Sequence, residues 1–592
     1  MEQKWFELHD ERRRKLEGSV WIPLRAINTI EEVGKTGHLG YRCEFYGVGS
    51  LAISIKQKVP TEKLGWMDVG ISNNHSGRVE HKKYIPCDVY QDYGGKFSGV
   101  HLILDQRGNS LEQHEWHLHQ DFVITLGLRR EKDSWVRIDE GYMEIAKLTR
   151  TRYGSPRILE VRASHLKDYL CARGMRLYVT SYRSRVAVLN DAMHITWAEN
   201  PYSQVNDTDR WEGRVLEIHE GGVGYGAKTA VFHVARTDVD VEEDVPAFHL
   251  PTDEQVKTHS WTKEHTGRKL YRVSGELWRN EWIEPAAKSP IIRIDKVPPT
   301  VFFITNSEGK KESEGTLIIG SRWLWFRPEV ISALAHRRGG FLSWSTRDTG
   351  GVGCSPDYGV HFGLNSIGLV NVYAKDIGQL PEWQQKIWSG YNIGPEGKVS
   401  EELLSFQMKA EPAATLAPEP FLSKGLATLD QLFKDKLGVR LLMHHEEFPH
   451  VISRAHRFRA TDKEGLFSLA KDLARLTADS FDTNAIQKLA KPPRDERWGS
   501  LKSLEHLLAT QVDPGIARAI IGPLVGIYEL RHADAHLPRS DHEEALCLVR
   551  VDRSSPYVLQ GYQLLDACVK SIYSIIGIVN KWAVNTTDRP LP

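Results

Sequence analysis

Residues 511–541 have the sequence QVDPGIARAIIGPLVGIYELRHADAHLPRSD, and they decide how the C-terminal part of the chain is interpreted. Asp513 followed by Pro514 predicts the start of a helix, because an aspartate side chain accepts hydrogen bonds from the first backbone N–H groups and proline suits the first helical position. Residues 524–530 are mostly apolar, and Pro538 should end the helix. We therefore predict a largely buried helix in this segment.

Polar side chains follow directly after the apolar stretch, in the hexapeptide RHADAH that begins at Arg531. Histidine exchanges protons near neutral pH, and the C-terminal end of a helix favours its charged form. Arginine keeps its charge and offers a forked set of donors that suits phosphoryl oxygens. These residue types make the polar cluster of Arg531, His532, Asp534 and His536 a candidate for chemistry on a phosphate group.

With this segment the chain resembles the HEPN superfamily, helical domains that include many ribonucleases of prokaryotic defence and toxin systems. The family motif is an arginine, then an asparagine, aspartate or histidine, and a histidine a few residues later. Arg531 matches the arginine, His532 the variable polar position and His536 the closing histidine. The resemblance covers residues 421–592 and implies a four- or five-helix bundle that cuts RNA, similar to HEPN proteins implicated in abortive infection.

The resemblance also implies a reaction and a quaternary structure. Cleavage without a metal ion or another cofactor requires the 2′-hydroxyl of RNA to attack the adjacent phosphorus and leave a cyclic phosphate. His536 would exchange protons and Arg531 would stabilise the developing negative charge. The two residues are five positions apart, about 140° around an ideal helix, and so do not share one face. In the family, dimerisation brings two motifs around one cleft, so we expect a homodimer through the helical domain. His532, one turn from His536, would orient the phosphate.

Two other interpretations stay open. His532 and His536 have the i, i+4 spacing of zinc-binding helices, with Asp534, Asp541 and His542 nearby, although the chain has no HExxH glutamate at this site. Alternatively, the protein binds a ligand or a nucleic acid without catalysis, and its helices serve only to dimerise. The second interpretation predicts intact RNA and motif variants that keep full biological activity.

Hydrophobic periodicity predicts that residues 421–592 are helical throughout. Apolar side chains recur on one helical face in two segments: Leu426, Leu429, Leu432, Phe433 and Leu437 in the first, and Leu466, Leu469, Ala470, Leu473 and Leu476 in the second. Residues 562–582 are apolar on several sides, which predicts a helix at the centre of a bundle or in a dimer interface. Residues 409–420, rich in proline and alanine, predict a linker before this region.

The part of the chain before the linker is rich in strands. Short β-branched and aromatic runs bounded by glycine, aspartate or asparagine predict a β-rich domain over residues 19–246, preceded by a charged helix at residues 1–18. Residues 247–408 predict a second domain that mixes strands with some helix. The expected fold is thus multidomain α+β: one or two sandwich- or barrel-like β domains, then an all-α HEPN-like bundle.

Charge is balanced over the whole chain, with 77 Lys and Arg against 77 Asp and Glu, so a site for a polyanion must be a local patch. In the helical region, the segment SRAHRFRATDK supplies the candidate RNA-binding residues Arg454, Arg457, Arg459 and Lys463. A second segment, RLYVTSYRSR at residues 176–185, alternates arginines with tyrosines, which suits the stacking and phosphate contacts of a nucleic acid. Alternation on a half-buried strand gives the same pattern.

Cellular location is inferred from the termini and the cysteines. The N-terminus is charged from its first residues, and the apolar run at residues 571–579 is too short to span a bilayer. Six scattered cysteines without a CxxC pair indicate reduced thiols. We expect a cytoplasmic protein without membrane contact, in which the β-rich part senses a trigger, such as a phage component, and the helical part acts.

Overall fold

The structure is a computed structural model that forms two compact units, Met1–Val297 and Pro298–Pro592. It describes residues 2–59, 64–66, 69, 78–80, 82–91, 98–106, 114–222, 226–236, 256–443, 446–531 and 539–582. The predicted multidomain α+β fold is confirmed, with a β-rich N-terminal region and a helical C-terminal region.

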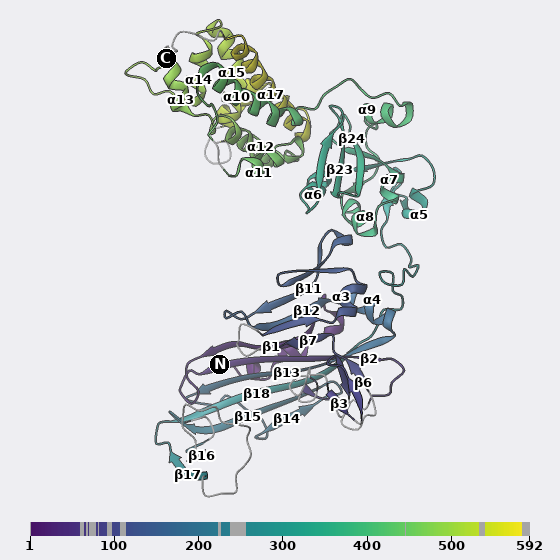
Figure 1. Cartoon of the computed structure of the whole chain (residues 1–592), viewed down its shortest axis with the longest axis vertical. Helices are drawn as coiled ribbons and strands as arrows, with labels where there is room; N and C mark the ends of the chain where they lie inside the picture. Colours follow the sequence, from purple (N-terminus) through teal and green to yellow (C-terminus); the bar gives the residue numbers. More distant parts are fainter. Residues whose placement is uncertain are drawn as a thin grey trace. The chain divides into compact units, whose positions relative to one another are not determined.

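The first unit is built on one antiparallel sheet of 12 strands (Figure 1). The main path of the sheet runs in the order β14-β15-β18-β13-β2-β1-β12-β11-β10-β9, and β6, paired with β5, adjoins β2. The strands of this sheet are β1 (Trp21–Val33), β2 (Arg42–Ser54), β5 (Val89–Gln91), β6 (Ser98–Val100), β9 (Leu128–Glu131), β10 (Ser134–Arg137), β11 (Met143–Arg150), β12 (Pro156–Arg162), β13 (Met175–Leu189), β14 (Tyr202–Val205), β15 (Asp209–His219) and β18 (Lys269–Ile283).

Smaller elements complete this unit. Three two-stranded pairs accompany the sheet: β3 (Arg78–Glu80) with β4 (Lys83–Ile85), β7 (Ile103–Gln106) with β8 (Glu115–Leu118), and β16 (Lys228–Arg236) with β17 (Val256–Glu264). The helices are α1 (Gln3–Phe6), α2 (His9–Arg12), η1 (Leu16–Gly18), α3 (Gln120–Thr125), η5 (Ile138–Glu140) and α4 (Ala163–Arg173). The long strands therefore share one sheet, where the sequence suggested one or two sandwich- or barrel-like domains.

The boundary predicted at residue 246 lies inside the first unit. β18 follows that position in sequence, yet its residues 271–283 pair with β13 on one side and its residues 269–279 pair with β15 on the other. Such pairing is non-local, and local composition does not reveal it. The structure instead places the division between Val297 and Pro298.

The N-terminal segment is not the single charged helix that was predicted. Leu8 has a left-handed backbone (φ 51°) that separates α1 from α2. Phe6 is fully buried, and its carbonyl oxygen accepts a hydrogen bond from the Trp211 indole at 3.0 Å. The segment lies so close to the sheet that a side chain at Gly275 would overlap the Phe6 carbonyl group. It therefore forms an arm packed on β13, β15 and β18.

Arginines of the sheet hold this N-terminal arm. Arg185 donates two hydrogen bonds of 2.9 Å to the Asp10 carboxylate, and these bonds keep the pKa of Asp10 below its usual range. Arg183 pairs with Glu11 at 3.2 Å. The guanidinium groups of the basic segment 176–185 that point to this face are thus neutralised within the protein.

The second unit begins with a mixed α/β part. Its six-stranded antiparallel sheet has the order β22-β23-β24-β25-β21-β26. The strands of this part are β19 (Phe303–Ile304), β20 (Lys311–Glu312), β21 (Trp323–Phe326), β22 (Phe341–Trp344), β23 (Thr349–Ser355), β24 (Tyr358–Leu364), β25 (Val370–Tyr373) and β26 (Asn392–Ile393). Its helices are α5 (Glu314–Leu317), α6 (Glu329–Ala335), α7 (Ala374–Gly378), α8 (Glu382–Ser389), α9 (Glu401–Leu404) and the π-helix η6 (Ser405–Lys409).

A helical bundle follows. Residues 410–417 contain no helix or strand, as expected for the linker, and α10 begins at Glu419. The elements of the bundle are α10 (Glu419–Leu437), α11 (Phe448–Arg454), η7 (Arg457–Arg459), α12 (Lys463–Leu476), α13 (Thr483–Leu489), α14 (Ser500–Leu508), α15 (Pro514–Leu530), α16 (Arg539–Val549) and α17 (Tyr557–Asn580).

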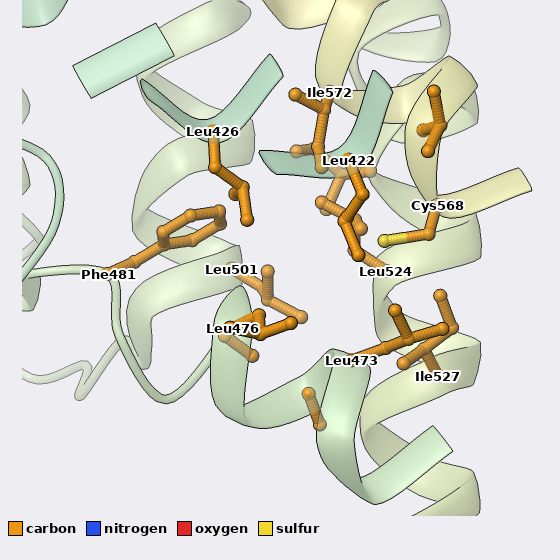
Figure 2. Packing of buried hydrophobic residues seen from close by; sticks show 14 of the residues in the cluster. Leu422, Leu426, Leu473, Leu476, Phe481, Leu501, Leu524, Ile527, Cys568 and Ile572 are labelled. Carbon is orange, nitrogen blue, oxygen red and sulfur yellow. The ribbon is translucent and has the colours of Figure 1, made fainter. Parts of the chain in front are cut away.

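The predicted apolar faces form the core of this bundle. All five apolar residues predicted for α12 are buried, and Leu426, Leu429 and Phe433 of α10 are buried with them. Figure 2 shows side chains of α10, α12, α14, α15 and α17 converging on this core. The helix α17 is long and apolar enough to cross a membrane, but one side of it packs in the core through residues such as Leu564, Cys568 and Ile572. One side of this helix thus lies in the core of the bundle, and the alternative of a dimer interface stays a prediction.

One arginine joins the bundle to the α/β part. The Arg457 side chain is completely buried, with its guanidinium 4.2 Å from the Trp344 ring centre and 4.6 Å from that of Tyr562. It donates hydrogen bonds of 2.7 and 2.8 Å to the two carboxylate oxygens of Glu419, and one of 2.8 Å to the carbonyl oxygen of Arg347. A cation buried this deeply is tolerated because a counter-charge and further acceptors surround it.

Replacing Glu419 should loosen this junction. The variant Glu419→Ala leaves the Arg457 guanidinium buried without its counter-charge, so we expect a loss of about 3–5 kcal/mol in stability of the second unit. Hydrogen exchange measured by mass spectrometry should become faster at residues 341–348 and 455–460. The matched control Glu464→Ala removes an exposed glutamate of α12 and should change the stability by less than about 0.5 kcal/mol. Equal exchange in the two variants would contradict the assigned role of the ion pair.

A buried histidine at the same junction should make the second unit acid-sensitive. Burial lowers the pKa of His456 to about 3, with a smaller effect from His336. The unfolded chain binds a proton near pH 6.5, whereas the folded chain does not, so stability is full above pH 6.5 and falls as the pH drops from 6.5 towards 3. Between pH 7 and 5 we expect a loss of up to about 2 kcal/mol from this group.

Denaturant unfolding at pH 7 and at pH 5 tests this prediction. The variant His456→Gln cannot take up the proton and should lose less stability on acidification than the unsubstituted protein. His450→Gln replaces an exposed histidine of α11 and should retain the full acid sensitivity. If both variants respond to pH like the unsubstituted protein, His456 is not the responsible group.

Candidate active site at the end of helix α15

The helix α15 forms as the sequence predicts. The Asp513 carboxylate accepts a hydrogen bond of 2.8 Å from the backbone N–H of Gly515, and Pro514 is the first helical residue. The helix continues through Pro523, and Leu524, Ile527 and Leu530 are buried. Its helical residues end at Leu530, eight positions before Pro538, which was expected to end it.

Arg531 is the C-cap residue of α15. A positive charge at this end complements the partial negative charge of the last carbonyl groups. Its guanidinium lies 4.5 Å from the Tyr528 ring centre and donates a hydrogen bond of 3.3 Å to the Tyr528 hydroxyl. A second nitrogen of the guanidinium contacts both carboxylate oxygens of Asp479. The side chain retains 22% of its exposure, so the group is fixed in place and still reaches the surface.

Sequence analysis did not identify Asp479 or Tyr528. Tyr528 precedes Arg531 by three residues, a helical spacing that was visible in the sequence. Asp479 is 52 positions away, in the turn after α12, where its backbone N–H donates to the carbonyl oxygen of Ala474. Only the packing of α12 against α15 brings Asp479 and Arg531 together, and no local motif signals such a contact.

The other residues of the predicted site are not described in the structure. His532, Asp534 and His536 lie in residues 532–538, outside the described residues. Asp541 and His542 belong to α16, but the structure does not describe their side chains. Within the parts of the chain that are described, no three His, Cys, Asp or Glu residues come together as metal ligands. Both the catalytic pair and the metal alternative therefore stay predictions.

A large groove with a volume of about 1660 Å³ reaches Tyr528, which contacts Arg531, although Arg531 itself does not line it. Its lining comes from α14, α15, α16 and α17, with contributions from neighbouring turns. Tyr528 belongs to this lining, and its ring contacts the Arg531 guanidinium. Two apolar residues of the lining are markedly exposed, Ile516 by 53% and Leu548 by 38%. The charged lining residues are balanced: Lys502, Arg518, Arg550 and Lys570 against Glu505, Glu529, Glu544 and Asp566.

The predicted RNA-binding patch does not form as expected. Arg457 is buried in the junction with Glu419, so the prediction is wrong for this residue. Two other arginines of the predicted patch form ion pairs with Asp472, Arg454 at 2.7 Å and Arg459 at 3.6 Å. Lys463 is exposed, with its ammonium 5.7 Å from the Phe467 ring centre. The basic sequence pattern reflects internal ion pairs more than a surface for RNA.

The described part of the site offers one chemical capability. A guanidinium held by a carboxylate and an aromatic ring is preorganised to bind an oxyanion, since its orientation costs little to maintain when the anion arrives. Asp479 occupies one side of this group, and a phosphate would share or displace that contact. Proton transfer requires a further residue, and His536 is the candidate from the sequence.

Comparisons of the chain with protein-family models, with curated proteins and with solved structures found no match. Membership of the HEPN superfamily therefore stays a prediction from the motif.

Proposed function

We propose that the protein is a metal-independent endoribonuclease whose active site lies at the end of α15. The observation that carries the proposal is the position of Arg531: the motif arginine is fixed by Asp479 and Tyr528 and is partly exposed at the end of α15. The residues of RHADAH supply the remaining chemistry.

The proposed reaction needs only groups of the protein and the RNA. The 2′-oxygen forms a bond to the adjacent phosphorus as a base removes the hydroxyl proton, and the bond from phosphorus to the 5′-oxygen breaks. The leaving oxygen takes up a proton, which yields a 2′,3′-cyclic phosphate and a 5′-hydroxyl. His536 would move the protons and Arg531 would stabilise the charge on the phosphoryl oxygens.

The proposal includes a homodimer formed through the helical bundle. The charges of the groove are balanced, and exposed Ile516 and Leu548 line it. Balanced charge disfavours a polyanion, whereas exposed apolar side chains favour a protein surface. A second copy of the bundle in this groove would bring two Arg531 residues towards one cleft.

The wider role is part of the same proposal. A cytoplasmic effector of anti-phage defence, or a toxin-like one, needs a part that detects its trigger, and the large sheet of the first unit would supply this part. The trigger is proposed as a phage component. A helical unit that cuts RNA then provides the response.

Cleavage of RNA by the purified protein tests the activity. We expect the full chain to cut total RNA or tRNA with EDTA present, leaving cyclic phosphate ends. Arg531→Ala and His536→Ala should each reduce the rate by about 10²-fold or more, because each removes a group that acts on the transition state. Arg531→Lys should restore only part of the rate, since lysine lacks the forked geometry.

Arg475→Ala is the matched control for this experiment, because Arg475 is an exposed arginine in the last turn of α12. It should cut RNA at the rate of the unsubstituted protein. Cleavage that chelation abolishes would favour the metal alternative. Intact RNA under all conditions, together with motif variants that keep full biological activity, would favour a non-catalytic binding protein.

The dimer has its own test in sedimentation or light scattering. The variants Ile516→Glu and Leu548→Glu place a carboxylate on the exposed apolar lining of the groove, and we expect them to be monomeric and inactive at concentrations where the unsubstituted protein is a dimer. Ile294→Glu changes an apolar residue of the first unit that is 82% exposed and should leave the dimer intact. A monomeric unsubstituted protein would refute this part of the proposal.

A further inference from the structure

Three aromatic side chains form a row across the large sheet of the first unit. Side chains of directly opposed residues in an antiparallel sheet point to the same face. Tyr182 of β13 is opposite Trp278 of β18, which is opposite Arg210 of β15. Phe45 of β2 lies diagonally from Tyr182, which is opposite Gly47. These strands are adjacent in Figure 1.

We call Phe45, Tyr182 and Trp278 the aromatic row. Ring centres are 5.9 Å apart between Phe45 and Tyr182 and 5.4 Å apart between Tyr182 and Trp278. The Arg210 guanidinium lies 4.7 Å from the Trp278 ring centre and extends the row to β15. Beside the row, the indole of Trp66 packs on Gly47, where a side chain would overlap it. The row is therefore a continuous surface over four strands.

The aromatic row does not serve the core of the unit. It lies on the face opposite the N-terminal arm. Arg183 and Arg185 hold that arm, and these odd-numbered residues of β13 point to the other face from Tyr182. Among the described residues, its three rings are half-buried and belong to none of the hydrophobic clusters that pack this unit. Large rings that add nothing to a core are typical of a binding surface.

Positive charge surrounds the aromatic row. On this face the four strands carry four arginines, Arg176, Arg210, Arg214 and Arg272, and two glutamates, Glu212 and Glu276. Arg176 also pairs with Glu284, the residue after β18, at 3.8 Å, so four arginines face three glutamates. The side chains of Arg210 and Arg214 are 55% and 47% exposed. Each forms an ion pair with Glu212, at 3.0 and 3.3 Å respectively. The chain as a whole is neutral, so this excess is local.

The two glutamates oppose each other directly across β15 and β18, an arrangement that costs free energy. Burial and the neighbouring Glu212 raise the pKa of Glu276. Burial and the neighbouring Glu276 raise the pKa of Tyr182 to about 12, so the tyrosine stays neutral.

We propose that the aromatic row binds unpaired bases of a single-stranded RNA, with Arg210 and Arg214 contacting its phosphates. Unpaired bases stack on aromatic side chains of proteins, and exposed guanidinium groups beside such rings neutralise the phosphate backbone. A duplex hides its bases and would gain only the phosphate contacts. This site is separate from Arg531 and binds RNA whether or not the bundle cleaves it.

Fluorescence anisotropy with a labelled single-stranded RNA of about twelve nucleotides tests the site. The full chain carrying Arg531→Ala and His536→Ala serves as the background, so that cleavage does not interfere. In this background Trp278→Ala and Tyr182→Ala should each weaken binding about tenfold or more, whereas Trp278→Phe keeps a ring and should lose much less. Trp261→Ala, which removes a 45% exposed tryptophan of β17, is the matched control and should bind normally.

Salt dependence gives a second measurement that does not depend on the folding of the row variants. Arg210→Ala alters an exposed side chain and should reduce the slope of log affinity against log salt by about 1. Affinity for single strands that is unchanged in the alanine variants overturns the proposal. So does equal binding of duplex RNA, or preferential binding of a neutral oligosaccharide. Because binding is measured without cleavage, failure of the nuclease proposal leaves this result unaffected.

Discussion

The burial of one guanidinium, that of Arg457, determines how the second unit holds together. No water can solvate this charge, so Glu419, the carbonyl oxygen of Arg347 and two aromatic rings must all be in place around it. These partners come from the start of α10, from the α/β part and from α17. The ion pair thus specifies one arrangement of the bundle against the α/β part, whereas apolar packing alone would tolerate several.

The position of the candidate site depends on how the helices pack in the core of the bundle. α15 packs against α12 and α17, and the same contact places Asp479 beside Arg531. A shift of α12 would therefore release the guanidinium from its carboxylate. Since η7 and α12 both adjoin the junction, the α/β part is mechanically connected to the position of Arg531.

The sequence predicted what local patterns determine and missed what distant contacts determine. Apolar periodicity located α10, α12 and α17, and Asp513 with Pro514 marked the start of α15, because capping and amphipathicity act within a few residues. The return of β18 to the centre of the sheet could not be predicted, since its partners lie far away in sequence. Arg457 was misinterpreted for a related reason: a run of arginines has the same sequence whether its charges face solvent or buried carboxylates. Asp479 gave no signal at all.

The N-terminal arm has a practical consequence for experiments on shortened chains. On one face of the sheet, Asp10 and Glu11 form ion pairs with Arg185 and Arg183, and carbonyl oxygens of the arm accept hydrogen bonds from Arg279. Removal of the first eighteen residues would leave three guanidinium groups without these partners and would uncover the apolar surface beneath Phe6. A truncated protein would then adsorb polyanions on the wrong side of the sheet. Affinities measured with it would describe an artefact of the deletion.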